Sequence, residues 1–171
     1  MADLSRASRI GEQSDVDLEA LPFLESLLLG TIDAALAAQN AVVALESLGL
    51  GSVFIGAIRN DIESVAKELE LPPQVYPVFG LCVGYPSDER PAKVKPRLPQ
   101  RAVLHHETYS AVSEADALAE YDELLGAFYK REGMKASGWS EQVINRLRSV
   151  SSLHGREELV EELKRMGFGL R

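Results

Sequence analysis

Residues 24–48 read LESLLLGTIDAALAAQNAVVALESL, and they carry the strongest structural signal in the chain. Alanine and leucine, which both favour helices, supply most of this stretch, and Gly49 follows it as a predicted C-cap. Its charged residues are Glu25, Asp33 and Glu46, so the predicted helix is apolar on almost every side. Such a helix either crosses a membrane or is buried in a core or between subunits.

Polar residues in the middle of this helix help to decide between those possibilities. Asp33, Gln39 and Asn40 interrupt the apolar run, and one central aspartate costs about 2.5–3.5 kcal/mol on insertion into a membrane. We therefore do not expect a membrane span. The alanines allow a second backbone to approach closely, which favours a helix–helix seam between two subunits. A core helix within a monomer is the alternative.

The composition is that of a soluble globular protein, and it excludes disorder and collagen-like repeats. The chain has 171 residues, a formal net charge of −8 and 46% hydrophobic residues. The negative charge argues against nucleic acid or an anionic membrane as the main partner. Cys82 is the single cysteine and has no internal disulfide partner, and the first ten residues lack the apolar region of a secretion signal. We therefore expect a cytoplasmic protein.

Shorter elements follow the long helix. Residues 53–55 are predicted to form a short strand, and residues 60–69 a helix capped by Asn60. The unalternating apolar run over residues 75–85 is typical of a central strand covered on both faces. The remaining predicted elements are a strand over residues 101–106 and helices over residues 114–130, 139–148 and 156–166. This order predicts an α/β or α+β protein.

The segment before Pro22 shows weaker signals than the rest. Residues 11–20 are acidic and polar and are interpreted as a surface connection. We expect no strand or helix before Pro22 that is strong enough to seed a domain.

A basic loop stands out in this acidic chain. Prolines stiffen the loop, and in an extended segment the side chains of Lys95 and Arg97 point to one side. A lysine point charge beside an arginine fork suits a phosphate group. The alternative is a solvated loop whose cations pair with acidic neighbours. The basic residues of this loop are Arg90, Lys93, Lys95, Arg97 and Arg101.

A second candidate lies in the connection FIGAIRN, residues 54–60. Gly56 and the small Ala57 allow a flat ligand to approach backbone N–H groups, but by themselves these residues favour a plain tight connection. No CxxC, HExxH, GxSxG, GxGxxG or P-loop motif occurs, and we expect no metal site. Cys82 is interpreted as a small buried hydrophobe, and the acidic pairs at residues 157–158 and 161–162 as a solvated helix face.

Four motifs occur in the same order as in a known family. They are AAQNAVVALESLGLG at residues 37–51, FIGAIR at 54–59, VFGLCVGYP at 78–86 and KPRLP at 95–99. With them the chain resembles the nitroreductase family, in particular its NADPH-dependent, oxygen-insensitive nitroreductases and flavin reductases. The resemblance continues through YDEL at residues 121–124 and Trp139-Ser140 to the C-terminus.

The resemblance implies an α+β fold with a nitroreductase-like sheet core, a long buried dimer helix and a helical C-terminal extension. It implies a homodimer with FMN at the subunit interface and NADPH as electron donor. The residues it assigns are Ile55, Gly56 and Ala57 against the flavin ring, Lys95 and Arg97 at the FMN phosphate or ribityl chain, Glu25 near the flavin, and Arg131 at the NADPH phosphate.

The implied activity is a ping-pong hydride transfer to a nitroaromatic, a quinone or free flavin. Relatives carry a phosphate-binding segment rich in His, Arg and Ser that has no counterpart in residues 1–171. We therefore expect a single nitroreductase-like domain over residues 1–171 that is truncated at its N-terminus. The alternative function is a non-catalytic dimer or interaction module that binds little or no flavin.

Overall fold

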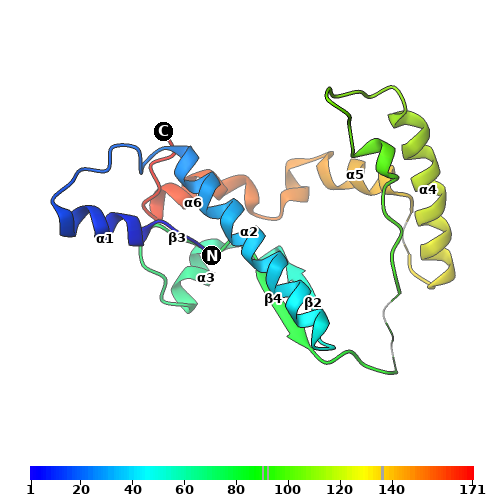
Figure 1. The fold of residues 1–171 in the computed structure, drawn as a ribbon, viewed down its shortest axis with the longest axis horizontal. Coiled ribbons are helices and arrows are strands. Elements are labelled where there is room, and N and C mark those ends of the chain that lie inside the picture. The colour runs from blue at the N-terminus through cyan, green and yellow to red at the C-terminus, as the bar shows by residue number, and fades with distance from the viewer. Residues whose placement is uncertain (90, 92, 136) are drawn as a thin grey trace. The chain divides into compact units, whose positions relative to one another are not determined.

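The computed structural model describes residues 1–89, 91, 93–135 and 137–171 (Figure 1). The chain forms two compact units, and the first is discontinuous in sequence. Unit 1 comprises Met1–Pro91 and His154–Arg171, and unit 2 comprises Ala92–Leu153. Arg90, the first cation of the predicted basic loop, lies outside the described residues.

The predicted long helix is confirmed as α2, Leu24–Ser47. One stripe faces the rest of unit 1, where Leu27 and Val42 are buried and Gly30 lies against the first strand. Gly49 follows the helix with a φ of +75°, as a C-cap glycine should. Most of α2 is exposed in this chain. By length and composition alone α2 could also cross a membrane. In this chain, 11% of its most apolar 18-residue stretch is buried.

The segment before Pro22 contains a strand and a helix, although we expected no element there that is strong enough to seed a domain. Strand β1, Ala2–Asp3, pairs antiparallel with β3, Val75–Tyr76, and helix α1 spans Ser5–Ser14. The Ala2 side chain is completely buried. A two-residue strand that depends on a distant partner leaves no periodicity for a sequence to show.

The apolar run over residues 75–85 is not one central strand covered on both faces. It divides into β3 and β4, Gly80–Gly84, and the proline at residue 77 lies between them. Strand β4 pairs antiparallel with β2, Gly51–Ile55, so that Phe54 lies opposite Leu81. Cys82 is exposed in this chain, which corrects the prediction of a buried hydrophobe.

The helix after β2 is capped by a different residue from the one predicted. A short 3₁₀ helix, η1, spans Ala57–Asn60, and helix α3 spans Ile62–Glu68. The capping side chain belongs to Asp61, whose Oδ1 accepts a 2.9 Å hydrogen bond from the Ser64 backbone N–H. Asn60 does not cap this helix because its side chain accepts from Arg156 instead.

The core of unit 1 joins the two ends of the chain. Helix α6, Leu159–Arg165, follows the 3₁₀ helix η4, Arg156–Glu158, and confirms the predicted C-terminal helix. Glu162 is buried rather than solvated, which corrects the interpretation of that acidic face. The buried members of this core are Ala2, Leu27, Ile62, Tyr76, Val78, Leu163 and Phe168.

Unit 2 is helical in its described residues. Helices α4, Glu114–Arg131, and α5, Trp139–Leu147, confirm two predictions. The strand predicted over residues 101–106 is wrong, because the 3₁₀ helix η2, Gln100–Ala102, occupies its start. A second 3₁₀ helix, η3, spans Val150–Leu153. The core is the cluster Tyr121, Leu125, Phe128 and Tyr129. With helices and short antiparallel strand pairs, the chain is α+β.

Candidate functional site

A pocket of about 570 Å³ lies in unit 1 beside the end of β2. Helix α2 forms one wall, and the other wall comes from β2, Gly56, Arg59 of η1 and the segment before β4. Its size falls in the range of small-molecule pockets, about 300–1,000 Å³. The lining residues are Ile32, Ala35, Leu36, Gln39, Phe54, Gly56, Arg59 and Phe79.

Gly56 and Arg59 form the polar edge of this pocket. The Nη1 group of Arg59 donates a 2.6 Å hydrogen bond to the carbonyl of Val78. A Cβ at Gly56 would lie 3.2 Å from Nη2 of Arg59, so the glycine leaves room for the guanidinium. Sequence reasoning missed Arg59. Its signal was its place in the same FIGAIR motif as Gly56.

The other residues predicted against the flavin ring flank Gly56. Ile55 ends β2 and pairs with Gly80, whereas Ala57 begins η1 and is exposed. The rings of Phe54 and Phe79 meet edge to face with centroids 5.1 Å apart. The structure therefore brings Ile55, Gly56 and Ala57 together at one end of β2, next to an aromatic pair.

Glu25 lies elsewhere on α2. It stands in the first turn of the helix and is exposed, and the pocket lining begins at Ile32. Seven helical residues correspond to about 10 Å along the axis. The structure thus does not bring Glu25 into the pocket with Gly56.

The described part of the basic loop in unit 2 shows two kinds of cation. Arg101 forms an ion pair with Glu120, as the solvated-loop alternative expects. The ammonium of Lys95 lies 5.0 Å from the centroid of the Tyr129 ring. Arg97 is exposed, and its Nη1 group donates a 3.2 Å hydrogen bond to the carbonyl of Lys95. Within the described residues, neither Lys95 nor Arg97 pairs with a carboxylate.

Arg131, the residue assigned to the NADPH phosphate, ends α4 in unit 2. Its guanidinium carbon lies 5.4 Å from the centroid of the Phe128 ring, and its Nε is 3.1 Å from a carboxylate oxygen of Glu132. The side chain is exposed, so the guanidinium keeps donors that face solvent.

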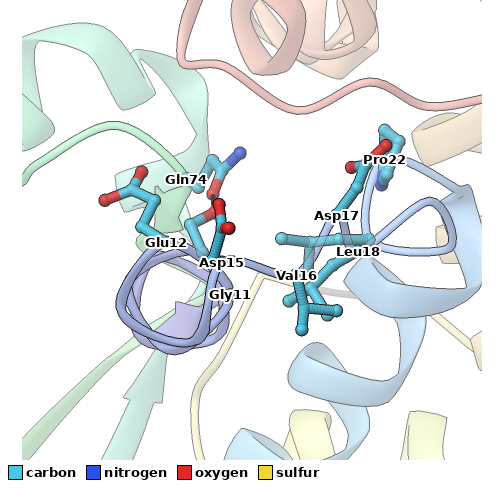
Figure 2. Close-up of a pocket in the computed structure, with 10 residues that line it drawn as sticks. Gly11, Glu12, Asp15, Val16, Asp17, Leu18, Pro22 and Gln74 are labelled. Carbon is cyan, nitrogen blue, oxygen red and sulfur yellow. Dashed lines mark hydrogen bonds between the residues drawn. The ribbon is translucent and has the colours of Figure 1, made fainter.

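A second pocket of unit 1, of about 580 Å³, has the wrong charge for a phosphate (Figure 2). Glu12 and Asp15 stand on the α1 side beside Gln74, and Asp17 lies on the opposite side with Val16 and Leu18. These carboxylates repel an anionic ligand. Among the described residues, no group of three or more His, Cys, Asp or Glu side chains is arranged to hold a metal ion.

Comparisons with known proteins identify the family of this chain. Residues 29–85 match the sequence model of the Nitroreductase family, and residues 95–171 match that of the Nitroreductase family, C-terminal domain. The structure of NfrA2 from B. megaterium is 37% identical in sequence, with a TM-score of 0.88 over 99% of this chain and 67% of that chain. The chain belongs to the nitroreductase family.

Two relatives show the range of this similarity. An NADPH-dependent oxidoreductase of Staphylococcus aureus (strain USA300) is 38% identical over 97% of this chain. The NADPH:FMN oxidoreductase from Vibrio harveyi, solved in complex with NAD⁺, is 33% identical with a TM-score of 0.81, over 99% of this chain and 65% of that chain. The chain spans 66% of the length of the Staphylococcus relative, just under two thirds.

Proposed function

We propose that this chain acts as an FMN-dependent NAD(P)H oxidoreductase that reduces nitroaromatics, quinones or free flavin. The observation that carries this proposal is the pocket at the end of β2, where Gly56 and Arg59 meet apolar walls in a chain of the nitroreductase family. Bound FMN would accept a hydride from the nicotinamide and pass two electrons to the acceptor.

The residues of the pocket fit a flat, partly polar ring. Phe54 and Phe79 supply an apolar surface, and Gln39 adds an amide from α2. At Gly56 a side chain would crowd the Arg59 guanidinium, so the glycine keeps the backbone accessible. We assign the contact with the ring to the backbone of Ile55, Gly56 and Ala57.

Arg59 has the chemistry to stabilise negative charge in this pocket. The guanidinium is a permanent cation, and one of its N–H groups is fixed on Val78. A fixed cation beside a group that gains electrons lowers the energy of the reduced form without reorganising during the reaction. We propose that Arg59 favours the anionic form of the reduced cofactor.

We assign binding of the phosphate and of the nicotinamide donor to residues of unit 2. Lys95 and Arg97 remain free of carboxylates among the described residues and offer charge-assisted donors to the FMN phosphate. Arg131 is assigned to the NADPH phosphate. The cycle is ping-pong, so the oxidised nicotinamide leaves before the acceptor occupies the same face of the site.

We also propose that a second copy of the chain covers α2. The outward side of this helix bears large apolar residues that water would otherwise contact. Asp33 and Gln39 on the same helix are unfavourable in lipid, so a protein partner fits better than a membrane. The exposed large apolar residues of α2 that do not line the pocket are Leu24, Leu28, Leu29 and Val43.

Flavin titration of the purified 171-residue chain tests the function. We expect FMN to be retained on desalting and NADPH to be oxidised in the presence of a nitroaromatic. The double variant Lys95→Ala/Arg97→Ala should raise the FMN dissociation constant roughly 100-fold, about 3 kcal/mol. Arg101→Ala is the matched control, because Arg101 is already paired with Glu120. A chain that stays colourless and oxidises no NADPH would support the non-catalytic alternative.

A further inference from the structure

Lys95 is held from one side by helix α4. Its ammonium nitrogen lies 5.0 Å from the centroid of the Tyr129 ring, which is within reach of a cation–π interaction. Tyr129 is buried, with 4% of its surface exposed, in the cluster that also contains Tyr121, Leu125 and Phe128. The ring is therefore a fixed surface, whereas a lysine side chain by itself is flexible.

The same helix also holds the backbone next to Lys95. The hydroxyl of Tyr121 donates a 3.3 Å hydrogen bond to the carbonyl of Pro96. Leu98 packs against the cluster that Tyr121 and Tyr129 belong to. Residues 95–98 are thus attached to α4 through a side chain, a carbonyl and an apolar contact, while Arg97 between them is exposed.

We propose that Tyr121 and Tyr129 are positioning residues, which hold the KPRL segment on α4 so that Lys95 and Arg97 are preset to receive a phosphate group. This inference rests on the proposed function, since it concerns the residues assigned to the FMN phosphate. It extends that function to two buried tyrosines. Tyr129 orients the ammonium, and Tyr121 fixes the backbone that sets the direction of Arg97.

The ionisation of Tyr129 agrees with this arrangement. The pKa of Tyr129 is lowered, chiefly by hydrogen bonding with the Lys95 side chain, with Gln142 adding to the effect and burial opposing it.

Preset geometry matters because ordering a lysine side chain opposes binding. A long flexible side chain loses much of its rotamer freedom when it is fixed on a ligand. A cation already held over a ring has lost part of that freedom before the ligand arrives, so less affinity is lost. Removal of the ring should therefore weaken phosphate binding even though Lys95 itself remains.

FMN affinity in five variants tests the positioning role. We expect Tyr129→Leu to raise the FMN dissociation constant about three- to tenfold, and Tyr129→Phe, which keeps the ring, to have a smaller effect. Tyr109→Leu is the matched control, because Tyr109 is an exposed tyrosine of the same unit. In a Lys95→Met background, Tyr129→Leu should cost no further affinity. An equal loss in both backgrounds would show a merely structural role and overturn the inference.

Two measurements keep this test independent of stability and of the cofactor. Fluorescence of Trp139, the single tryptophan, reports whether unit 2 is folded in each variant. NMR titration of tyrosines labelled at the ring carbon, assigned with Tyr129→Phe, follows the Tyr129 pKa without FMN. Lys95→Met should raise that pKa, and an unchanged pKa would overturn the positioning inference alone. Failure of the wild-type chain to bind FMN, with the pKa shift present, would overturn the proposed function instead.

Discussion

The guanidinium of Arg59 and the carbonyl of Val78 form a 2.6 Å hydrogen bond that joins the turn after β2 to the segment before β4. Val78 is buried, so its carbonyl has few other partners. We expect Arg59→Met to lower the free energy of unfolding by about 1–3 kcal/mol, because a buried acceptor is left unsatisfied. Urea unfolding measures this change.

Arg59→Lys separates the two roles of this residue. Lysine keeps the positive charge but lacks the planar guanidinium, whose several N–H groups can contact the Val78 carbonyl and the pocket at the same time. We expect Arg59→Lys to retain more FMN affinity than Arg59→Met, as read from quenching of flavin fluorescence. Equal affinity in Arg59→Met and in the wild-type chain would contradict the assignment of Arg59 to the pocket.

Gly155 should tolerate no side chain. Its φ is +94°, and a Cβ there would lie 2.4 Å from the carbonyl oxygen of Asn60. We expect Gly155→Ala to destabilise the chain by at least about 2 kcal/mol in urea unfolding. Gly126 in α4 is the control, because a Cβ there meets nothing within 4 Å. Gly126→Ala should stabilise by about 0.5–1 kcal/mol.

Glu162 makes the stability of unit 1 depend on pH. Its Oε2 is buried with no hydrogen-bond partner among the described residues. Burial raises the pKa of Glu162 above its ordinary 4.5, and the nearby Glu63 and Asp61 raise it further, while Arg165 opposes them. The folded state therefore holds this proton more tightly than the unfolded state. The stabilising contribution of Glu162 is complete at pH values below its pKa in the unfolded state. It is lost as the pH rises through its pKa in the folded state.

Glu162→Gln should remove that pH dependence. At neutral pH we expect the variant to be more stable than the wild-type chain by about 1 kcal/mol, since a neutral amide replaces a buried charge. Glu161→Gln is the adjacent control: Glu161 is exposed, and hydrogen bonding from Lys164 lowers its pKa. Urea unfolding from acidic to neutral pH compares the two variants. If the difference in the free energy of unfolding between the wild-type chain and Glu162→Gln does not change with pH, the assignment of the pH dependence to Glu162 is contradicted.

The outward face of α2 should control association. We expect Leu29→Glu to raise the dissociation constant of the proposed dimer roughly 100-fold or more, because a carboxylate would be buried at the seam. Sedimentation velocity measures the change. Ile144→Glu, on the exposed side of α5, is the control and should leave association unchanged. A wild-type chain that sediments as a monomer at high concentration would contradict the proposed dimer.

The long helices could be predicted from sequence because each carries its own signal. Helices α2 and α4 show runs of good helix formers, and their predicted bounds agree with the structure to within a residue. The family could also be predicted, because four motifs in register are far more specific than any one of them. Neither inference required knowledge of tertiary contacts.

The elements that were predicted wrongly depend on distant partners. Strand β1 exists because Ala2 pairs with Tyr76, and the Asn60 side chain is occupied by Arg156, which leaves the cap of α3 to Asp61. No local pattern encodes such pairings.

Only part of the candidate site could be predicted, because some of its residues also depend on distant partners. Gly56 could be chosen because glycine permits close approach to the backbone. Arg59 had only its place in the FIGAIR motif as a signal, because its contact with Val78 appears only in the folded chain. Tyr129 could not be chosen, because its role comes from a contact with Lys95 that only the folded chain shows.

The discontinuity of unit 1 has a consequence for biosynthesis. Leu163 and Phe168, from the C-terminal segment, complete a core that begins with Ala2 and Leu27. A chain leaving the ribosome therefore cannot close this core until its last turn of helix has been made, although α2 has emerged long before. Until then the apolar residues on both the inward and the outward side of α2 are exposed to water. We expect the nascent chain to need a chaperone during that interval, and unit 2, whose core is continuous in sequence, to fold first.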